Sequence, residues 1–177
     1  VQLANMANLL KAMGEYKRSI QAYKEAIADL SLVQNSRNIS NLATTLGQLG
    51  TTYESAGQYD KALEAYQIQI DTMAGKSYFH PLAKALPIIR TGRLLGKTGK
   101  IAQAERLLRQ GLSVARENRH VMFSVFASSE LATVLSLQRR FQEAMEIRRL
   151  GLQIIQNQDF DRTHITNSHR VAIGKIP

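Results

Sequence analysis

The sequence predicts an all-α protein, an α-solenoid built from antiparallel helix pairs in about four repeats. Three observations lead to this prediction. Apolar residues recur at i, i+3, i+4 and i+7 in one segment after another, which places them on one face of a helix. Tight turns separate the segments in pairs, and three of these turns carry a glycine. The paired segments repeat along the chain, which indicates a repeat architecture rather than a single folded core.

The period is clearest at the residue that opens the second helix of each pair. From Tyr16 to Tyr59 the step is 43 residues, from Tyr59 to Ile101 it is 42, and from Ile101 to Phe141 it is 40. An apolar stripe precedes each turn, and the four stripes are Leu3, Met6, Ala7, Leu10; Leu46, Leu49, Gly50, Tyr53; Ile88, Thr91, Gly92, Leu95; and Ser128, Leu131, Ala132, Leu135. One pair cannot bury two apolar faces, so neighbouring pairs must stack.

The helices are expected at regular places along this frame. The first helices are predicted near 2–13, 40–56, 81–97 and 120–138, and the second helices near 16–33, 59–74, 101–117 and 141–156. The repeats then span roughly 1–36, 37–79, 80–119 and 120–156, which together form one helical repeat domain over 1–156. His80-Pro81 is typical of a helix start, and Pro87 indicates a kink or a later start of the same helix. Residues 157–177 are predicted to be a linker with a candidate fifth repeat beginning near Ile165.

Small residues mark where the two helices of a pair approach closely. Gly50, Gly92 and Ala132 lie on the first helices, and Ala62, Ala104 and Ala144 lie opposite on the second helices. Glycines at 14, 57 and 99 are predicted to end three of the first helices, because glycine readily adopts the left-handed backbone conformation.

The second repeat carries a motif that resembles the tetratricopeptide repeat (TPR) family. The run Leu46-Gly47-Gln48-Leu49-Gly50-Thr51-Thr52-Tyr53, followed by Gly57, Tyr59, Ala62 and Tyr66, is similar to the family's Leu-Gly-x2-Tyr … Ala-x3-Phe pattern. Leu46 stands where the family has Trp, and the repeat is longer than the usual ~34 residues. The long repeat is similar to kinesin light chain and Pins-type adaptors. The resemblance implies a right-handed solenoid that serves as a protein-binding scaffold and not an enzyme.

Composition excludes several classes of site. The sequence has no cysteine, which rules out disulfides, thiolate metal centres and a cysteine nucleophile, and fits an intracellular, cytoplasmic protein. No apolar stretch approaches the ~20 residues of a membrane span, so no membrane partner is expected. Because the sequence opens on Val1 rather than Met, we expect a piece of a longer protein.

The net charge of +9 is concentrated in the second half of the chain. Residues 1–89 hold 8 Lys and Arg against 7 Asp and Glu, whereas residues 90–177 hold 15 against 7. A basic half favours an acidic partner, and an alternative function is association with nucleic acid. The candidate phosphate contacts are Arg106, Arg109, Arg116, Arg119, Arg139 and Arg140.

Patterns that suggest catalysis or cofactors are weak. Thr91 to Thr98 resembles a phosphate-binding loop, but its first position is Thr91 rather than Gly, and the repeat frame puts it at the end of a helix. His164 and His169 are five residues apart with no carboxylate partner pattern. We therefore expect no catalytic residues, no metal and no cofactor.

In a TPR solenoid the first helices line a concave groove. The resemblance therefore implies a peptide-binding face made of Asn5, Asn8, Gln48, Thr51, Arg90, Arg93, Lys97, Glu130 and Thr133. Arg90 and Arg93 lie three apart on one face, and a fork of two guanidinium groups suits a carboxylate or phosphate. Ala4 and Leu86 stand where a chaperone-type carboxylate clamp has lysines, so the favoured ligand is an acidic or extended peptide or helix.

Three alternatives stay open at the level of sequence. The domain is a peptide-binding scaffold, a nucleic-acid-associated repeat, or a regulatory module of a larger multidomain protein. Association through the terminal repeats is a further expectation, because end repeats leave apolar surface open. Arg148 occupies the position of Tyr23, Tyr66 and Leu108, which predicts either an ion pair or an exposed end helix.

Overall fold

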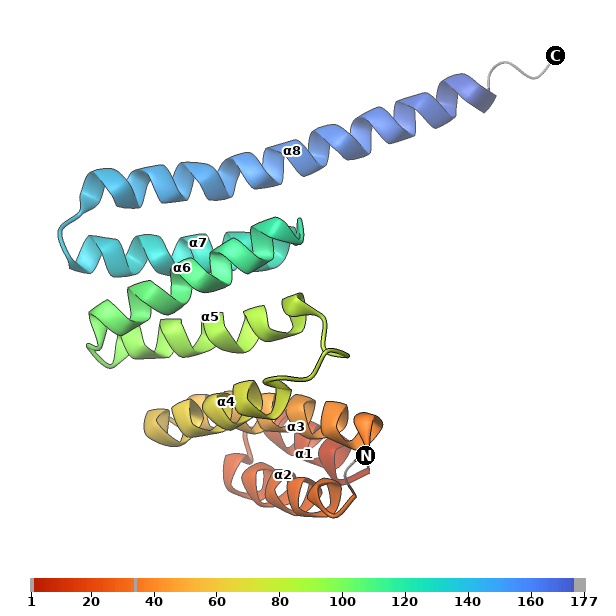
Figure 1. Cartoon of the computed structure of the whole chain (residues 1–177), viewed down its shortest axis with the longest axis vertical. Helices are drawn as coiled ribbons and strands as arrows, with labels where there is room; N and C mark the ends of the chain where they lie inside the picture. Colours follow the sequence, from red (N-terminus) through yellow and green to blue (C-terminus); the bar gives the residue numbers. More distant parts are fainter. Residues whose placement is uncertain (1, 34, 174–177) are drawn as a thin grey trace.

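The computed structural model describes the backbone of residues 2–33 and 35–173, and side chains in these ranges up to Asn157. Eight α-helices and no strand occur in these ranges: α1 Gln2–Ala12, α2 Tyr16–Ser31, α3 Ser36–Ser55, α4 Tyr59–Met73, α5 Pro81–Lys97, α6 Ile101–Glu117, α7 Val121–Leu137 and α8 Phe141–Ile173. They form four antiparallel pairs that follow one another along the long axis of the molecule (Figure 1). The predicted solenoid of helix pairs is confirmed.

Stacking buries two continuous apolar clusters. Each first helix packs on its own second helix, and α3, α5 and α7 also pack on the second helix of the preceding pair. The first helices α1 and α3, and α5 and α7, contact each other as well. The cluster in the first two repeats includes Tyr23, Tyr53 and Tyr66, and it takes in Leu94 from α5. The cluster in the last two repeats includes Leu108, Leu131 and Leu135. The side chains therefore interlock across every repeat junction, as the stripes predicted.

The turns inside the pairs depend on the left-handed backbone region. Gly14, Gly57 and Gly99 have φ of 78°, 73° and 81°, as their sequence positions predicted. The fourth turn places Arg139 there instead, with φ of 61°. The turn closes in the same way, because the Arg140 amide donates to the Leu135 carbonyl at 3.0 Å, as the Lys100 amide does to the Leu95 carbonyl at 2.9 Å. A side chain in this conformation costs roughly 1–2 kcal/mol.

Replacing Arg139 with glycine should therefore stabilise the protein by about 0.5–1 kcal/mol, because glycine removes the strain while adding some unfolded-state entropy. The Arg139 side chain is exposed, so little packing is lost. Urea unfolding monitored by circular dichroism measures the change. Arg106→Gly in the middle of α6 is the control and should destabilise by about 1 kcal/mol. A loss of stability in Arg139→Gly would show that the turn does not need glycine.

Two boundaries differ from the sequence expectation. Helix α3 begins at Ser36 rather than near residue 40, because the Asn35 side chain caps it by accepting from the Asn38 amide at 2.8 Å. Helix α8 continues through the expected linker as far as Ile173. Between Leu152 and Ile173 the sequence has neither Gly nor Pro, so nothing in it breaks the helix. Of the candidate fifth repeat near Ile165, the residues up to Ile173 belong to α8, and residues 174–177 lie outside the described residues.

Pro87 lies inside α5, which begins at Pro81, so the later start is wrong for this helix. The Pro87 side chain is buried, and its carbonyl accepts from the Thr91 hydroxyl at 2.8 Å. His80 caps the same helix by accepting from the Leu82 amide at 3.2 Å, which confirms His80-Pro81 as the helix start. None of the helices in the described part of the chain is long and apolar enough to span a membrane.

Candidate functional site

The groove between the first helices is the candidate functional site. It is an open hollow of about 610 Å³ on the side of the molecule where α3, α5 and α7 lie next to one another. The residues that line it are Thr51, Glu54, Ser55, Tyr59, Leu86, Arg90, Arg93, Lys97, Met122, Phe123 and Phe126. Three repeats thus contribute to a single surface that combines basic and apolar side chains.

Glu54 is the centre of the polar contacts in this groove. Its carboxylate lies 2.6 Å from Nη2 of Arg93 and 3.7 Å from Nζ of Lys97. The Tyr66 hydroxyl donates to the same carboxylate at 3.2 Å. Burial and the Glu54 charge raise the pKa of Tyr66 well above its usual range, so this hydroxyl stays a donor. Glu54 therefore links α3 of its own repeat to α5 of the next repeat.

Arg90 lies one helical turn from Arg93 but has a different environment. It is half-buried, lines the groove and has no ion pair within the described residues. Lys11 donates to the Thr51 hydroxyl at 2.6 Å. It lies close enough to Arg90 for the Arg90 charge to shift the pKa of the Lys11 ammonium. Burial and then the Arg90 charge lower the pKa of the Lys11 ammonium, against the opposite effect of Glu54. Among the described residues, therefore, no carboxylate forms an ion pair with Arg90.

Aromatic side chains from α7 form the far wall of the groove. The Arg93 guanidinium lies over the ring of Phe126, with its central carbon 5.8 Å from the ring centroid. Phe123 packs against the His120 ring at a centroid distance of 4.0 Å, and His120 caps α7 by accepting from the Phe123 amide. Met122 is strongly exposed beside them. An apolar side chain of a ligand would find its contacts here.

The structure places the nine predicted groove residues in different settings. Thr51, Arg90, Arg93 and Lys97 line the hollow. Asn8 accepts from the Tyr23 hydroxyl at 2.5 Å. Of the remaining four, Gln48 and Glu130 are partly buried, and Asn5 and Thr133 are exposed. All nine lie on first helices, as their register predicted, and their role in binding a peptide stays a prediction.

The predicted fork of Arg90 and Arg93 is not what the structure shows. Arg93 is already engaged by Glu54 and Phe126, which leaves Arg90 as the guanidinium without a carboxylate. Glu130 lies near enough to Arg93 and Lys97 for their charges to act on it. Burial raises the pKa of the Glu130 carboxyl in spite of these two cations.

The sequence reasoning missed Glu54 and the aromatic wall. Glu54 corresponds in the repeat frame to Lys11, and both contact the next first helix, Lys11 at Thr51 and Glu54 at Arg93. The sequence signal that could have identified Glu54 was therefore its position in the repeat frame, one helical turn beyond Thr51 on the face that carries the predicted groove residues. The sequence alone does not place Phe123 and Phe126 in the groove, because their position relative to it depends on how α7 packs against α5.

The weak catalytic and metal patterns gain no support from their positions. Thr91 to Lys97 lies in the last turns of α5, so the C-terminal end of a helix stands where a phosphate-binding loop needs an N-terminus. No group of three or more potential metal ligands occurs within the described residues. The side chains of His164 and His169 lie outside them.

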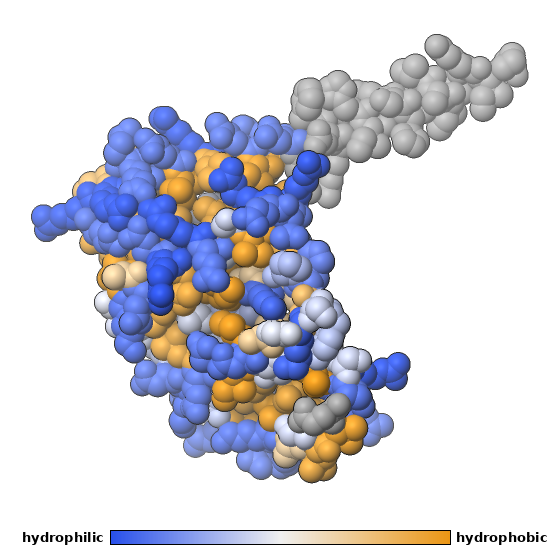
Figure 2. All heavy atoms as spheres, in the orientation of Figure 1, coloured by the Kyte–Doolittle hydropathy of each residue, from blue (hydrophilic) through white to orange (hydrophobic). Residues whose placement is uncertain are grey.

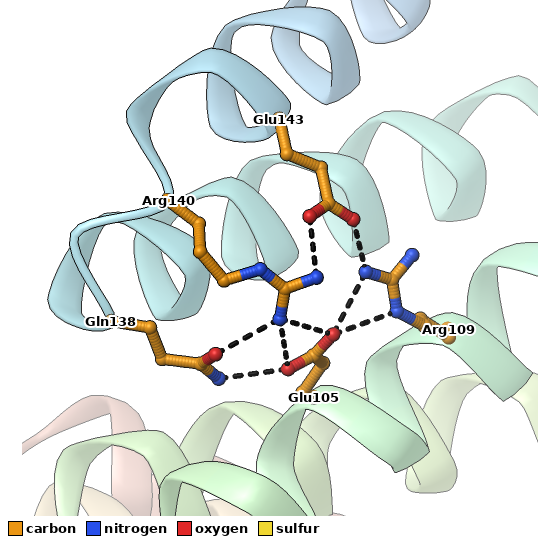
Figure 3. A network of polar contacts seen from close by, with 5 residues as sticks. All are labelled: Glu105, Arg109, Gln138, Arg140 and Glu143. Atoms are coloured by element: carbon orange, nitrogen blue, oxygen red, sulfur yellow. Dashed lines mark hydrogen bonds and ion pairs between the residues drawn. The ribbon is translucent and has the colours of Figure 1, made fainter.

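The basic half contains an ion-pair network that joins α6 to α8 (Figure 3). Glu105 accepts from Arg109 at 2.8 Å and from Arg140 at 2.9 Å, and both guanidinium groups also contact Glu143. Gln138 donates to Glu105 at 2.8 Å. Two of the six arginines considered as phosphate contacts, Arg109 and Arg140, are thus already neutralised within the protein.

This network predicts a stability difference that depends on pH. Burial acts to raise the pKa of Glu105, but hydrogen bonds from Gln138 and the two arginines outweigh it and lower the pKa below its ordinary value. A lowered carboxyl pKa stabilises the fold above the unfolded-state value near ~4.3 and ceases to do so as pH falls through the folded-state value.

We expect wild type to exceed Glu105→Gln in free energy of unfolding by about 1 kcal/mol at pH 7. The difference should shrink once the pH falls below about 4.3, because protonation then removes the same charge from wild type. Urea titrations at several pH values measure it. Glu146→Gln on α8, exposed and without an ion pair in the described part of the chain, is the control. A pH-independent difference would contradict the role assigned to the network.

Arg148 is exposed on α8 and lines a small hollow with Ser128 and Gly151. Of the two explanations for a charge at this apolar position, the exposed end helix is confirmed. No ion pair of Arg148 occurs within the described residues.

Comparisons with known proteins agree with this architecture. Residues 1–67 match the tetratricopeptide repeat family model. A search of curated protein sequences gave no match. The chain superposes on BtubC (BKLC) from P. vanneervenii with a TM-score of 0.78 and 18% identity, covering 88% of this chain and 62% of that one. For apo RapI the TM-score is 0.78 at 14% identity, covering 86% of this chain and 41% of that one.

The TPR-like repeats of a protein assigned as a kinesin light chain from Podosopora anserina give a TM-score of 0.55 at 14% identity. They cover 89% of this chain and 95% of that one. The chain spans about three fifths of BtubC and about two fifths of RapI. At these identities the likenesses show a shared fold. The chain therefore has the TPR-type helical repeat fold, and the resemblance to long-repeat TPR proteins is confirmed.

Proposed function

We propose that this TPR-type repeat domain is a protein-interaction scaffold whose concave groove binds an acidic, extended segment of another protein. The observation that carries the proposal is Arg90, a half-buried guanidinium that lines the groove without a carboxylate among the described residues. A ligand carboxylate at this point would gain a charge-assisted hydrogen bond that the protein itself does not supply. Repeat proteins commonly use such extended concave surfaces for binding.

The rest of the groove suggests what accompanies the acidic group. Leu86, Phe123 and Phe126 provide apolar contact area next to Arg90. A segment that alternates acidic and apolar side chains would place one kind on Arg90 and the other on the α7 wall. Arg93 and Lys97 contribute less to ligand charge recognition, because Glu54 already neutralises part of their charge.

A peptide library displayed on phage tests this proposal without knowledge of the natural partner. We expect selection on the protein to enrich peptides that combine Asp or Glu with large apolar residues. An enriched peptide, labelled with fluorescein, should bind Arg90→Glu at least tenfold more weakly than wild type, which is about 1.4 kcal/mol. Fluorescence polarisation at two salt concentrations measures the affinity and its electrostatic part.

The control is Arg106→Glu, an equal change of charge at an exposed position of α6 outside the groove. Circular dichroism melting curves show that both variants are folded. Equal affinity of wild type and Arg90→Glu for every enriched peptide would refute the groove model. Equal weakening by both substitutions would point to net charge, and so to the nucleic-acid alternative, which a labelled RNA or DNA oligonucleotide then tests directly.

A further inference from the structure

Lys11 of α1 and Arg90 of α5 are two cations on the groove side of the first helices. Hydrophilic side chains cover much of the face of the molecule that Figure 2 shows, so charge alone does not mark a site. Lys11 and Arg90, however, are partly buried, and neither forms an ion pair within the described residues. Burying a charge without a counter-ion costs free energy, so such a pair is a candidate site for an anion.

Thr51 of α3 connects the two cations. Its hydroxyl accepts from the Lys11 ammonium at 2.6 Å, and its side chain lines the same hollow as Arg90. Burial and then the Arg90 charge lower the pKa of the Lys11 ammonium, so the two cations lie close enough to repel each other. Three consecutive repeats therefore bring an ammonium, a hydroxyl and a guanidinium group to one part of the groove.

Glu54 is a carboxylate whose charge also reaches Lys11, where it opposes the effect of Arg90. Its oxygens already lie 2.6 Å from Arg93 and 3.7 Å from Lys97. These two cations exceed the single negative charge of Glu54, so the three residues together carry a net positive charge. Glu54 therefore leaves Lys11 and Arg90 without neutralisation, and the net charge around it attracts an anion as well.

The Lys11 side chain is directed to the following repeat and not to a preceding one. Lys11 and Glu54 are equivalent in the repeat frame, and each contacts the next first helix. The residue that Lys11 contacts is Thr51, whose equivalent in the first repeat is Asn8. A first helix ahead of α1 would by the same rule contact Asn8 and not Lys11. The pair formed by Lys11 and Arg90 is therefore an interior feature of the groove, whatever precedes this chain.

We propose that the groove binds a phosphorylated peptide, with the phosphate group of a phosphoserine or phosphothreonine held by Lys11, Thr51 and Arg90. The phosphate site rests on the peptide groove proposed above and specifies the acidic group that the groove prefers. At pH 7 a phosphate group carries a charge of about −1.5 to −2 and three acceptor oxygens, so it can balance both cations at once. A single carboxylate would leave one of them without a counter-charge. The guanidinium fork suits two phosphate oxygens, and the ammonium suits the third.

The aromatic wall of the groove favours a peptide over a nucleic acid as the source of the phosphate. Single-stranded nucleic acid stacks its bases on the faces of aromatic rings. The Arg93 guanidinium already lies over the Phe126 ring. The Phe123 ring packs against His120 at a centroid distance of 4.0 Å. Leu86 adds an aliphatic surface on the same wall as Arg90, which suits the apolar side chains that flank a phosphorylated residue.

Three peptide libraries test the phosphate site without knowledge of the natural partner. Their sequences are random except for one fixed central residue, which is phosphoserine, glutamate or serine. We expect the phosphoserine library to bind the 177-residue chain most strongly. The best phosphopeptide should bind about tenfold more tightly than the same peptide with glutamate, and the serine peptide should bind most weakly. Fluorescence polarisation at one fixed ionic strength measures the three affinities.

Lys11→Met distinguishes a phosphate from a carboxylate. It should weaken the phosphopeptide about tenfold and the glutamate peptide by less than about threefold, because Arg90 alone can pair with a single carboxylate. Arg90→Met should weaken both peptides. Lys24→Met, the same change at an exposed position of α2 outside the groove, is the control and should change neither affinity. Circular dichroism shows that the variants are folded, and inorganic phosphate, which should displace the phosphopeptide better than chloride at equal ionic strength, needs no variant.

The results separate the phosphate site from the groove itself. If the phosphopeptide and the glutamate peptide bind equally well and both depend on Arg90, the groove proposal stands and the phosphate site is wrong. If none of the libraries binds, both are wrong. A phosphopeptide affinity that Lys11→Met leaves unchanged would also overturn the phosphate site. Binding of a labelled single-stranded oligonucleotide in place of the phosphopeptide, lost in Lys11→Met, would instead identify a nucleic acid as the ligand.

Discussion

Gly50→Ala should lower the free energy of unfolding by about 1–3 kcal/mol, even though alanine is the better helix former. A Cβ at Gly50 would lie 2.4 Å from Cε1 and 2.7 Å from Cδ1 of Tyr66. The ring is fully buried, and its hydroxyl is held by Glu54. The ring cannot move away from the added Cβ without separating α3 from α4. The substitution therefore destabilises the protein by disturbing the packing at the centre of the repeat.

Gly96→Ala is the matched control for this prediction. It is also a helical glycine of a first helix, but its added Cβ would lie 3.1 Å from Cγ2 of Val134 and 3.8 Å from Cβ of Ala104, which is an ordinary van der Waals contact. A shift of a few tenths of an ångström relieves the contact with Val134, so Gly96→Ala should change stability by less than about 1 kcal/mol. Urea unfolding of both variants gives the comparison. If Gly50→Ala is as stable as Gly96→Ala, the close approach of α3 and α4 is not a constraint on residue 50.

The repeat frame explains why the fold was predictable from the sequence. Each helix pair repeats the same apolar spacing, so the error at one boundary does not propagate to the next. The two helix boundaries that the sequence predicted wrongly are the start of α3, which a local hydrogen bond determines, and the end of α8, where no helix-breaking residue is present. Asn35 caps α3 ahead of its apolar stripe, and the polar stretch after Gln156 contains no residue that ends α8.

The candidate site was predictable only in part. The register assigns Arg90 and Arg93 to the groove side of α5, because that follows from the helical period alone. It does not say that a carboxylate from the preceding repeat reaches one of them and not the other. That difference depends on the distance between α3 and α5 and on the length of each side chain, which the period does not determine.

Removing the Glu54 carboxylate should have the second large effect. Glu54→Ala should lower the free energy of unfolding by about 1.5–3 kcal/mol, because it leaves Arg93 without its partner in a mostly buried position. The figure lies below that for a fully buried pair, since part of Arg93 reaches solvent and Phe126 still contacts its guanidinium. The Nε atom of Arg93 already lacks a hydrogen-bond partner within the described residues.

A double-mutant cycle separates this ion pair from ordinary truncation. Arg93→Met keeps the aliphatic stem against Phe126 and removes the charge, so Glu54→Ala should cost much less in that background. The sum of the two single changes in the free energy of unfolding should then exceed the change in the double variant by about 1 kcal/mol or more. Additive effects would mean that Glu54 acts through Tyr66 alone. Peptide binding gives an independent readout. Glu54→Ala leaves the charges of Arg93 and Lys97 without their carboxylate, so it should strengthen the binding of an acidic peptide. The same substitution should lower the stability of the fold.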